Sequence, residues 1–311
     1  MSAILISEFI SSQALETLKA HHQVDYRPEL YQDLDALRIS LAKVDGLIVR
    51  NLTKVNADLL KNADRLKVVG RLGVGLENID LQTCAQKKIA VIPATGANAD
   101  SVAEYVIGTS IALMRGFASA SSETLAGTWP RLNFSSRHEL ADRVLGIVGF
   151  GSIGRIVAQK AIAMKMKCIA FDPAIQESHI ELGTHAVPIL SLHQVLQQSD
   201  VITLHLPFLP ETKNLFNATT LDLMKAGAYL INTARGKIVD EIALAERLQS
   251  GRLGGAALDV FANEPAKDLN HFKGIPNLIL TPHIAGVTTE SNERVSLMIA
   301  REVNSFLESR T

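Results

Sequence analysis

Cysteine is scarce in this sequence, whose 311 residues include only Cys84 and Cys168. Two cysteines are too few for the disulfide framework of a small secreted protein or for a cysteine-rich metal cluster. No grouping of histidines and cysteines has the spacing of zinc ligands, so we expect no metal site. A basic segment before the first apolar run is also missing, and no stretch approaches the roughly 18 consecutive apolar residues of a membrane helix. We therefore expect two buried thiols in a cytoplasmic protein without a membrane partner.

An excess of charge of either sign is missing as well, because 31 lysine and arginine residues face 32 aspartate and glutamate residues. A nearly neutral chain lacks the basic field that attracts nucleic acid or an anionic membrane surface. Aromatic residues make up only 5% of the chain, too few for platforms on which single-stranded bases stack. The hydrophobic share of 47% instead indicates a folded protein, and we expect its partner to be a small molecule rather than nucleic acid.

What the sequence does contain is a regular alternation of short β-rich apolar runs with helix-length segments. This alternation is typical of right-handed βαβ units, so the expected fold class is α/β with parallel sheets. The apolar runs are too numerous to form the strands of a single sheet, which favours two doubly wound domains. The predicted strands are Ala3–Ser7, Asp45–Arg50, Leu66–Arg71, Ile89–Pro93, Arg143–Gly149, Lys167–Asp172, Asp200–Pro207, Ala228–Asn232, Gly255–Val260 and Asn277–Thr281.

The segment Ala99–Arg115 marks the expected boundary between the two domains. It has a helical composition and an almost uncharged second half, as expected of a helix buried between elements or between subunits. We therefore expect a first domain of residues 1–99, a second domain of residues 100–283, and a return to the first domain through residues 284–311. The last predicted helix, Glu290–Ser309, would complete the first domain.

A glycine-rich segment, Gly149-Phe150-Gly151-Ser152-Ile153-Gly154, lies between a predicted strand and a helical pattern. In a dinucleotide-binding turn the first glycine permits the tight turn, the second lets the backbone approach a pyrophosphate, and the third allows close helix–strand packing. The helix N-terminus then offers free N–H groups to the phosphates. Asp172 ends the next strand, where it would accept from the ribose hydroxyls and repel a 2′-phosphate. The predicted cofactor is therefore NAD rather than NADP.

Three charged residues in the same half of the chain, Arg235, Glu264 and His283, follow strand-like runs. Open α/β sheets bind ligands at such strand ends. The planar guanidinium of an arginine pairs with a carboxylate through two hydrogen bonds, and a histidine exchanges protons near neutral pH. A glutamate can hold the imidazole tautomer and stabilise its protonated form. The pattern suits oxidation of a 2-hydroxy acid, although a surface ion pair and a loop histidine would have the same spacing.

Seven segments match, in order and over nearly the whole chain, the signatures of one family. The sequence resembles the D-isomer-specific 2-hydroxyacid dehydrogenases, which include phosphoglycerate, glycerate/hydroxypyruvate and formate dehydrogenases. The segments are GRLGVGLENID, ATGANADSVAEYVIG, LGIVGFGSIGR, VITLHLPFLPET, INTARGKIVDE, ALDVFANEP and TPHIAG. The resemblance implies that Arg235 binds the substrate carboxylate and that Glu264 and His283 form the acid/base pair of an NAD-dependent oxidoreductase. It also implies a Rossmann-type NAD domain inserted into a flavodoxin-like substrate domain.

The same resemblance implies further contacts with the cofactor and with the substrate. Asp259 would bind the nicotinamide carboxamide. The other residues implied at the cofactor, besides the glycine turn and Asp172, are Ser152, Ile153, Leu206, Pro207, Thr233, Ala234, Ala285 and Gly286. Backbone N–H groups of Gly73, Val74 and Gly75 would meet the substrate carboxylate.

Arg50, Arg71 and Asn98 match residues near the substrate in the phosphoglycerate dehydrogenase branch of the family. Two cations beyond the carboxylate site suggest a second anionic group on the substrate: a phosphate, a sulfonate or another carboxylate. The segments RNLTKV, PATGAN and AGTWPR are most similar to sulfolactate-dehydrogenase-type members, which favours 3-sulfolactate. The alternatives are a 3-phosphoglycerate dehydrogenase, a hydroxypyruvate/glyoxylate reductase, or a structural ion-pair role for both arginines.

A function of another class also fits the fold, because an NAD-sensing corepressor-like binding protein can retain the same residues. Turnover of 2-keto acids with NADH would distinguish an enzyme from such a protein. The resemblance and the uncharged segment Tyr105–Met114 imply a homodimer built on the nucleotide domain.

Overall fold

The computed structural model describes residues 1–309, which divide into two compact units. The first unit comprises Met1–Asn98 and the segment that begins at Val287, and the second comprises Ala99–Gly286. The sequence places Ala99 and residues 284–286 in the first domain, whereas the structure places them in the second unit. The reason is local, because helix α5 begins at Ala99 and the backbone after His283 is hydrogen-bonded to Asp259.

The first unit is built on a five-stranded parallel sheet with the strand order β2-β1-β3-β4-β5. Its strands are β1 (Ala3–Ile6), β2 (Gln23–Tyr26), β3 (Gly46–Val49), β4 (Val68–Arg71) and β5 (Ala90–Pro93). The strand order reverses between β1 and β3, and open parallel sheets bind ligands at the carboxyl ends of the strands beside such a switch point. A ligand of this unit is therefore expected at the loops that follow β1 and β3.

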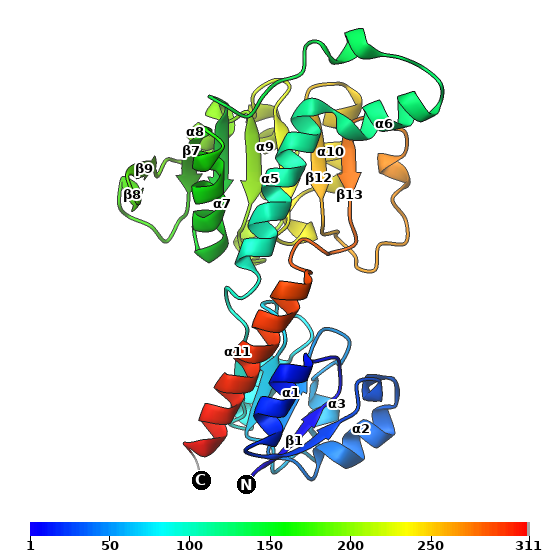
Figure 1. Cartoon of the computed structure of the whole chain (residues 1–311), viewed down its shortest axis with the longest axis vertical. Helices are drawn as coiled ribbons and strands as arrows, with labels where there is room; N and C mark the ends of the chain where they lie inside the picture. Colours follow the sequence, from blue (N-terminus) through cyan, green and yellow to red (C-terminus); the bar gives the residue numbers. More distant parts are fainter. Residues whose placement is uncertain (310–311) are drawn as a thin grey trace. The chain divides into compact units, whose positions relative to one another are not determined.

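Helices cover both faces of this sheet because side chains alternate along each buried strand. Ile4 and Ile6 of β1 pack in one cluster with α1 (Ser12–Lys19) and α11 (Thr289–Glu308), whereas Leu5 packs in the opposite cluster. The helices of that opposite layer are α2 (Leu34–Leu41), α3 (Ala57–Leu60) and α4 (Leu81–Gln86). Helices α1 and α11 lie side by side although they come from opposite ends of the chain (Figure 1).

The second unit contains a six-stranded parallel sheet with the strand order β13-β12-β11-β10-β6-β7. Its strands are β6 (Val144–Val148), β7 (Lys167–Phe171), β10 (Val201–Leu204), β11 (Tyr229–Asn232), β12 (Gly255–Leu258) and β13 (Leu278–Leu280). Here the order reverses between β6 and β10. The loops at the carboxyl ends of these two strands therefore flank the expected ligand crevice of this unit.

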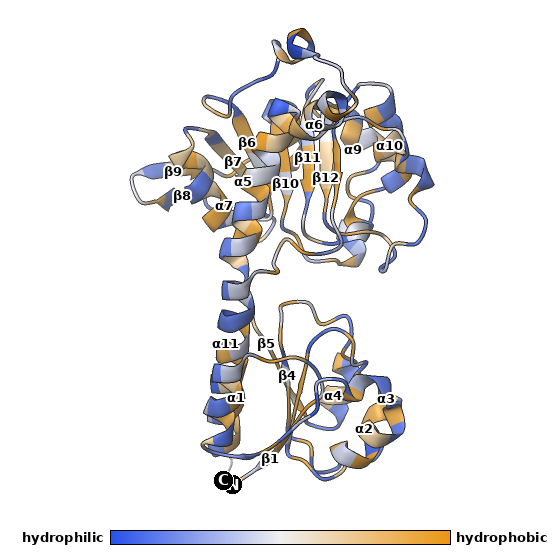
Figure 2. Ribbon diagram, turned by 45° about the vertical axis from the view of Figure 1, so that its right-hand side comes forward, coloured by the Kyte–Doolittle hydropathy of each residue, from blue (hydrophilic) through white to orange (hydrophobic). Residues whose placement is uncertain are grey.

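Helices also cover both faces of the second sheet. Helices α5 (Ala99–Arg115) and α7 (Ser152–Ala163) pack side by side on one face (Figure 1). The opposite layer contains α8 (Leu192–Gln198), α9 (Ala218–Leu223) and α10 (Glu241–Gln249), and α6 (Phe117–Leu125) follows α5. The central strands between the two layers are mostly hydrophobic, as Figure 2 shows for β11 and β12. The α/β fold class with two doubly wound parallel sheets is thus confirmed.

Every predicted run contains a strand, and the helix expected at Ala99–Arg115 has these bounds in the structure. The sequence does not reveal strand β2, nor the antiparallel hairpin of β8 (His179–Leu182) and β9 (His185–Pro188). Their sequences QVDY, HIEL and HAVP carry exposed polar side chains, so they lack the apolar run that marks a buried strand. Short 3-10 helices lie at Leu30–Gln32, Arg131–Phe134, Pro210–Thr212, Gly236–Ile238 and Asn270–Phe272.

Both cysteines are buried and unpaired, as the sequence predicts. Burial raises the pKa of the Cys168 thiol to about 12, which keeps this group protonated and unreactive. Among the helices of residues 1–309, none combines the length and the apolar character that a membrane span requires.

Candidate active site

The glycine-rich turn of the second unit joins β6 to α7. Gly149 has a φ of +97°, in the left-handed region that favours glycine, and a Cβ there would lie 2.6 Å from the carbonyl oxygen of His205. A Cβ on Gly154 would lie 2.3 Å from the carbonyl oxygen of Gly149, so the helix can pack against the turn only with glycine at this position. Around Gly151, by contrast, no heavy atom of residues 1–309 beyond its chain neighbours lies within 4 Å of the place that a Cβ would take. The backbone before Ser152, the first residue of α7, is therefore open to a phosphate group.

Asp172, directly after β7, is tied to this glycine turn. Its Oδ2 accepts the N–H of Phe150 at 2.8 Å, and its Oδ1 accepts the N–H of Ala174 at 2.9 Å. The carboxylate thus orders the turn, a function that the sequence does not reveal. Each carboxylate oxygen retains a further acceptor position, which is what a ribose hydroxyl would need.

The loop after β10 lies beside the end of β6, because the N–H of His205 donates to the carbonyl oxygen of Val148 at 2.7 Å. Burial lowers the pKa of His205 to about 3, so its imidazole is neutral, and its Nε2 pairs with the Thr203 hydroxyl at 3.0 Å. Leu206 is buried in the hydrophobic core, whereas Pro207 is exposed. Both residues are expected at the cofactor, and Pro207 is therefore the one of the two with an accessible side chain.

Arg235 follows β11 in a turn that Asn232 holds in place. The buried Asn232 amide accepts the N–H of Ala234 and donates to the carbonyl oxygen of Arg235, both at 3.0 Å. The guanidinium of Arg235 donates to the carbonyl oxygen of Ala234 at 2.7 Å. A Cβ on Gly236 would lie 1.9 Å from the carbonyl carbon of Phe261, so the turn packs directly on the backbone that follows β12. Only glycine permits this approach of the two strand-end loops.

His283 and Glu264, which follow β13 and β12, form a direct pair. The imidazole Nδ1 lies 2.6 Å from Glu264 Oε2, and the N–H of Phe261 donates to Glu264 Oε1 at 3.0 Å. The hydrogen bond that His283 Nδ1 donates to Glu264 raises the pKa of His283 against the opposing effects of burial and of Arg235. Burial acts to raise the pKa of Glu264, but the hydrogen bonds from His283 and Phe261 hold it below its ordinary value. Because Nδ1 pairs with the carboxylate, Nε2 is the ring atom left to exchange a proton.

Asp259, in the loop after β12, is 1% exposed and accepts three hydrogen bonds through its carboxylate. The Thr281 hydroxyl donates at 2.6 Å, the N–H of Ile284 at 2.7 Å and the N–H of Ala285 at 2.8 Å. These bonds fix the backbone that directly follows His283. A carboxylate has about four acceptor positions, so one is left for the predicted contact with a carboxamide.

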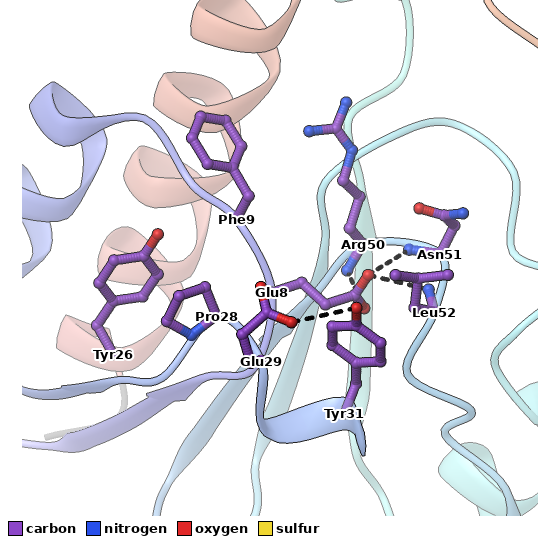
Figure 3. A pocket seen from close by; sticks show the side chains of 9 residues that line it. All are labelled: Glu8, Phe9, Tyr26, Pro28, Glu29, Tyr31, Arg50, Asn51 and Leu52. Carbon is purple, nitrogen blue, oxygen red and sulfur yellow. Dashed lines mark hydrogen bonds between the residues drawn. The ribbon is translucent and has the colours of Figure 1, made fainter. Parts of the chain in front are cut away.

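In the first unit, a pocket of about 340 Å³ lies at the carboxyl ends of β1, β2 and β3 (Figure 3). The buried carboxylate of Glu8 accepts the backbone N–H groups of Arg50, Asn51, Leu52 and Thr53 at 2.8–3.1 Å. Figure 3 shows this carboxylate directed at the loop backbone, whereas the Arg50 guanidinium points away from it. Glu8 therefore fixes the loop through its backbone and does not engage the guanidinium. The pocket is lined by Glu8, Phe9, Tyr26, Pro28, Glu29, Tyr31, Arg50, Asn51 and Leu52.

The guanidinium of Arg50 donates to the side-chain oxygen of Asn292, near the start of α11, at 2.5 Å. Asn78 also holds this loop, because its side-chain amide donates to the backbone carbonyl oxygen of Arg50 at 3.2 Å. Burial lowers the pKa of Arg50 and the charge of Glu8 opposes this, but an arginine remains protonated in either case. The hydrogen-bond partner of the guanidinium is a neutral amide rather than a carboxylate, so the structural ion pair considered for Arg50 is not observed among the described residues.

Arg71 ends β4 and lies over the glycine turn that follows. Its Nη1 occupies the place of a Cβ on Gly73, at 1.4 Å, and donates to the carbonyl oxygen of Leu72 at 3.2 Å. The guanidinium therefore supports the turn of Gly73, Val74 and Gly75. The side-chain oxygen of Asn98 is buried and has no hydrogen-bond partner within the described part of the chain, as expected of an atom that meets a ligand.

The comparison with known families agrees with this geometry. Residues 107–285 match the family model described as "D-isomer specific 2-hydroxyacid dehydrogenase, NAD binding domain". The chain belongs to this family. It is an NAD-dependent dehydrogenase of 2-hydroxy acids. Membership of this family favours an enzyme over the NAD-sensing binding protein, the other function that the sequence leaves open.

Relatives of this dehydrogenase differ in the acid that their names specify. A protein named (S)-sulfolactate dehydrogenase, from Chromohalobacter salexigens, is 44% identical over 307 residues, which cover 99% of each chain. A D-3-phosphoglycerate dehydrogenase from Synechocystis sp. is 36% identical over 99% of this chain, which spans 54% of that longer protein. Among solved structures, D-lactate dehydrogenase from Aquifex aeolicus, complexed with NAD and lactic acid, has a TM-score of 0.79 and 30% identity, with 99% of this chain and 96% of that chain covered.

The second unit of this dehydrogenase fits NAD in three respects. The backbone is open at Gly151, and Asp172 keeps acceptor positions for a ribose. The hydroxyl of Thr233, at the end of β11, is buried and makes no hydrogen bond within residues 1–309. A group of the cofactor can satisfy this hydroxyl, and Thr233 is among the residues expected at the cofactor.

Several residues that hold the site together escape sequence reasoning. Glu8, Asn232 and Thr281 each fix a loop that carries a predicted site residue. Asn232 and Thr281 stand inside the matched segments INTARG and TPHIAG, so their positions next to Arg235 and His283 are a signal that could have identified them. Glu8 has no such signal, because its four partners lie 42–45 residues further along the chain.

Proposed function

We propose that this dehydrogenase acts on a D-2-hydroxy acid with a second anionic group, and that this acid is 3-sulfolactate. The observation that carries the proposal is Arg50, a cation that lines a pocket and whose loop Glu8 fixes. The 44% identity with an (S)-sulfolactate dehydrogenase over 99% of both chains supports the same substrate. D-configured 3-sulfolactate carries the S descriptor because sulfur reverses the priorities at C2, so the two configurations agree.

In the proposed reaction, Arg235 binds the carboxylate of the acid and His283 exchanges the proton of its C2 oxygen. The guanidinium holds the carboxylate through two parallel hydrogen bonds and so fixes C2 relative to the imidazole. During oxidation, Nε2 of His283 takes the hydroxyl proton, and Glu264 stabilises the imidazolium through Nδ1. When bound, NAD supplies the acceptor for the hydride of C2. During reduction, Nε2 returns its proton to the C2 oxygen.

The pH dependence of the reaction follows from the raised pKa of His283. Oxidation needs the neutral imidazole, so its kcat/KM is expected to rise with pH through a pKa above the ordinary histidine value. The substitution Glu264→Gln removes the largest contribution that raises this pKa, so the rise should move to lower pH. The measurement is kcat/KM for oxidation between pH 5 and 9 in both enzymes. Glu290→Gln, at the exposed start of α11, is the control, and equal profiles for wild type and Glu264→Gln would refute the role of Glu264.

Cofactor choice tests the role of Asp172. Asp172→Ala removes the acceptor for the ribose hydroxyls and the charge that repels a 2′-phosphate, so the NAD/NADP ratio of kcat/KM should fall by about 10–100-fold. Because Asp172 also orders the glycine turn, Asp172→Asn, which keeps an acceptor for Phe150, separates the loss of charge from disorder of the turn. Asp142→Ala, an exposed position of the same unit, should leave the ratio unchanged. An unaltered ratio in both Asp172 variants would contradict the assignment.

The charges around the pocket favour a tail with a single negative charge. Of the nine described residues that line it, Arg50 is the cation, whereas Glu8 and Glu29 are acids. A sulfonate carries one negative charge, but a phosphate monoester carries about −1.5 to −2 at pH 7. One arginine beside two carboxylates therefore suits a sulfonate better than a phosphate. Phosphoglycerate remains the second candidate, supported by the 36% identity with a D-3-phosphoglycerate dehydrogenase.

The substrate is tested by the consumption of NADH with sulfopyruvate, phosphohydroxypyruvate, hydroxypyruvate and glyoxylate. We expect the highest kcat/KM with sulfopyruvate. Arg50→Gln should lower this value by about 100-fold and the value for hydroxypyruvate by less than about threefold, because only the former loses a charged partner. Arg65→Gln, at an exposed arginine of the same unit outside the pocket, should lower neither. A preference for phosphohydroxypyruvate would establish the second candidate. A preference for hydroxypyruvate or glyoxylate would identify a reductase of those acids, and no turnover of any acid would indicate a binding protein.

A homodimer formed by the second unit is also proposed. Figure 1 shows α6 and the segment after it extending beyond the helices that cover the sheet. Four large apolar side chains of this segment are 51–90% exposed: Phe117, Leu125, Trp129 and Leu132. Large exposed apolar side chains on one segment indicate an interaction surface, and the partner that we propose for it is a second copy of the chain. Light scattering should give twice the 33.7 kDa mass of one chain, and the mass of a single chain would refute the dimer.

We also propose that the enzyme works in the cytoplasm. The two thiols are buried and unpaired, which is compatible with a reducing compartment. Fractionation of cells that express the tagged protein tests this location, and recovery outside the cytoplasmic fraction would refute it.

A further inference from the structure

A chain of short hydrogen bonds runs from helix α5 to the loop of His283, entirely within the second unit. The hydroxyl of Tyr105 lies 2.6 Å from the hydroxyl oxygen of Thr281. The Thr281 hydroxyl in turn donates to Asp259 Oδ1 at 2.6 Å. Asp259 then accepts the N–H groups of Ile284 and Ala285, the two residues after His283.

The direction of each bond in this chain follows from the number of protons available. A carboxylate accepts only, so the single hydroxyl proton of Thr281 is used for Asp259. Between Tyr105 and Thr281, the donor must therefore be the phenol. Burial raises the pKa of Tyr105, as does the nearby charge of Asp259, against the opposing hydrogen bond with Thr281. The phenol is thus kept in the protonated form that this direction requires.

The end of the chain holds His283 in an uncommon backbone conformation. His283 has a φ of +57°, a left-handed value that few residues other than glycine adopt. Its N–H donates to the carbonyl oxygens of Asp259 at 2.8 Å and Thr281 at 3.0 Å. The carboxylate of Asp259 holds the next two N–H groups, so the same residue fixes the backbone on both sides of the imidazole-bearing Cα. A strained backbone conformation persists only where several contacts with the surrounding structure hold it, and such positions cluster at functional sites.

We propose that Tyr105 and Thr281 are positioning residues for the proton transfer, acting through Asp259 on the backbone of His283. The proposal rests on the proposed function, in which His283 exchanges the substrate proton. Neither Tyr105 nor Thr281 needs to touch the acid or the cofactor for this. They set the place of the imidazole, and with it the 2.6 Å hydrogen bond from Nδ1 to Glu264 and the direction of Nε2. A displacement of a reacting group by about 1 Å costs about 100-fold in rate, so this support matters for turnover.

The test is a set of hydroxyl deletions assayed for kinetics and for the pKa of His283. Thr281→Val keeps the shape and removes the donor to Asp259, and we expect kcat to fall by about 10–100-fold while KM for NAD changes little. Thr281→Ser restores the hydroxyl and should return kcat to within about threefold of wild type. Tyr105→Phe removes the first donor and should lower kcat by about 3–10-fold. With a substrate deuterated at C2, the isotope effect on kcat should increase in both Thr281→Val and Tyr105→Phe, because the chemical step becomes slower.

A second measurement avoids turnover altogether. In the ligand-free enzyme, NMR titration of the His283 imidazole should show a pKa lower by about half a unit in Thr281→Val, because the relaxed loop weakens the hydrogen bond to Glu264. The groups that act on this imidazole are Glu264, Asp259 and Arg235, and the substitution alters none of them chemically. Thr281→Ser should restore the wild-type value. A purely structural role for Thr281 would lower the melting temperature and leave this pKa unchanged.

Two control variants remove hydroxyls at the amino ends of the strands of the same unit. Ser199→Ala deletes a buried hydroxyl that donates to the carbonyl oxygen of Val195, and Tyr229→Phe deletes the phenol at the start of β11. Both should leave kcat, the isotope effect and the His283 pKa unchanged. Wild-type values of all three in Thr281→Val would overturn the positioning role. If His283→Ala is also fully active, the proposed function itself fails, whereas an inactive His283→Ala confines the failure to this inference.

Discussion

His283→Ala is expected to lower kcat in both directions by about 10²–10⁴-fold, the range that general acid/base catalysis contributes. Alanine leaves Glu264 without the imidazole and removes Nε2, the atom assigned to the proton of the C2 oxygen. The cofactor turn at Gly149 and Gly151 belongs to other strand ends and stays intact. The dissociation constant of NADH, measured by fluorescence titration, should therefore stay within about twofold of wild type, because no contact to the cofactor is assigned to the imidazole.

A matched histidine deletion separates catalysis from a general loss of structure. His185 lies in the exposed hairpin of β8 and β9, and His185→Ala should keep wild-type kcat. His283→Gln keeps a side chain that can pair with Glu264 but that cannot serve as a base near neutral pH, so it should be as inactive as His283→Ala. Normal turnover in either His283 variant would exclude His283 as the acid/base.

Arg235→Ala should lower kcat/KM for the acid by about 10²–10³-fold, which corresponds to about 3–4 kcal/mol. The substitution removes the fork that fixes the substrate carboxylate and leaves this charge without a partner. Arg235→Lys restores the charge but not the planar pair of donors, so it should recover only part of the loss. The turn itself should persist, because the Asn232 side chain binds the backbone N–H of Ala234 and the backbone carbonyl oxygen of Arg235, and these contacts do not involve the guanidinium.

The assignment of Arg235 is checked by a neighbour and by chemical rescue. Lys237 is exposed and lies two residues further along the chain, and Lys237→Ala should leave kcat/KM unchanged. Guanidinium added to Arg235→Ala should restore part of the activity if the missing group is the carboxylate partner. Wild-type kcat/KM in Arg235→Ala would mean that the carboxylate binds elsewhere.

Much of the fold could be predicted because its signals are local. The buried strands read as apolar runs, since both faces of a doubly wound sheet are covered by helices. The helix Ala99–Arg115 was identified by a composition that is almost uncharged along its second half. Strand β2 and the hairpin of β8 and β9 lacked this signal because their exposed faces carry polar side chains. The domain boundaries were displaced by one and three residues, since hydrogen bonds rather than composition decide where a unit ends.

The candidate site could also be predicted from the sequence only in part. The tight turn between a strand and a helix requires glycine at positions 149 and 154, because a Cβ at either position would meet the backbone. This motif can be recognised in the sequence. The two predicted arginines of the first unit looked alike there. In the structure, Arg50 lines a pocket while Arg71 lies over Gly73. Glu8 binds the backbone of the Arg50 loop, a contact between residues more than 40 positions apart.

The sequence by itself determined the fold class, the family and the cofactor, because apolar periodicity and residue types at strand ends are properties of neighbouring residues. Only the tertiary structure shows which distant side chains meet at the candidate site. Tyr105 and Thr281 are 176 residues apart, and only the packing of α5 against the sheet brings their hydroxyls to 2.6 Å. Strand order and register create such contacts, and no local pattern encodes them. The scarcity of cysteine and the balance of charge therefore limited the class of protein, while hydrogen bonds between distant residues hold its candidate active site together.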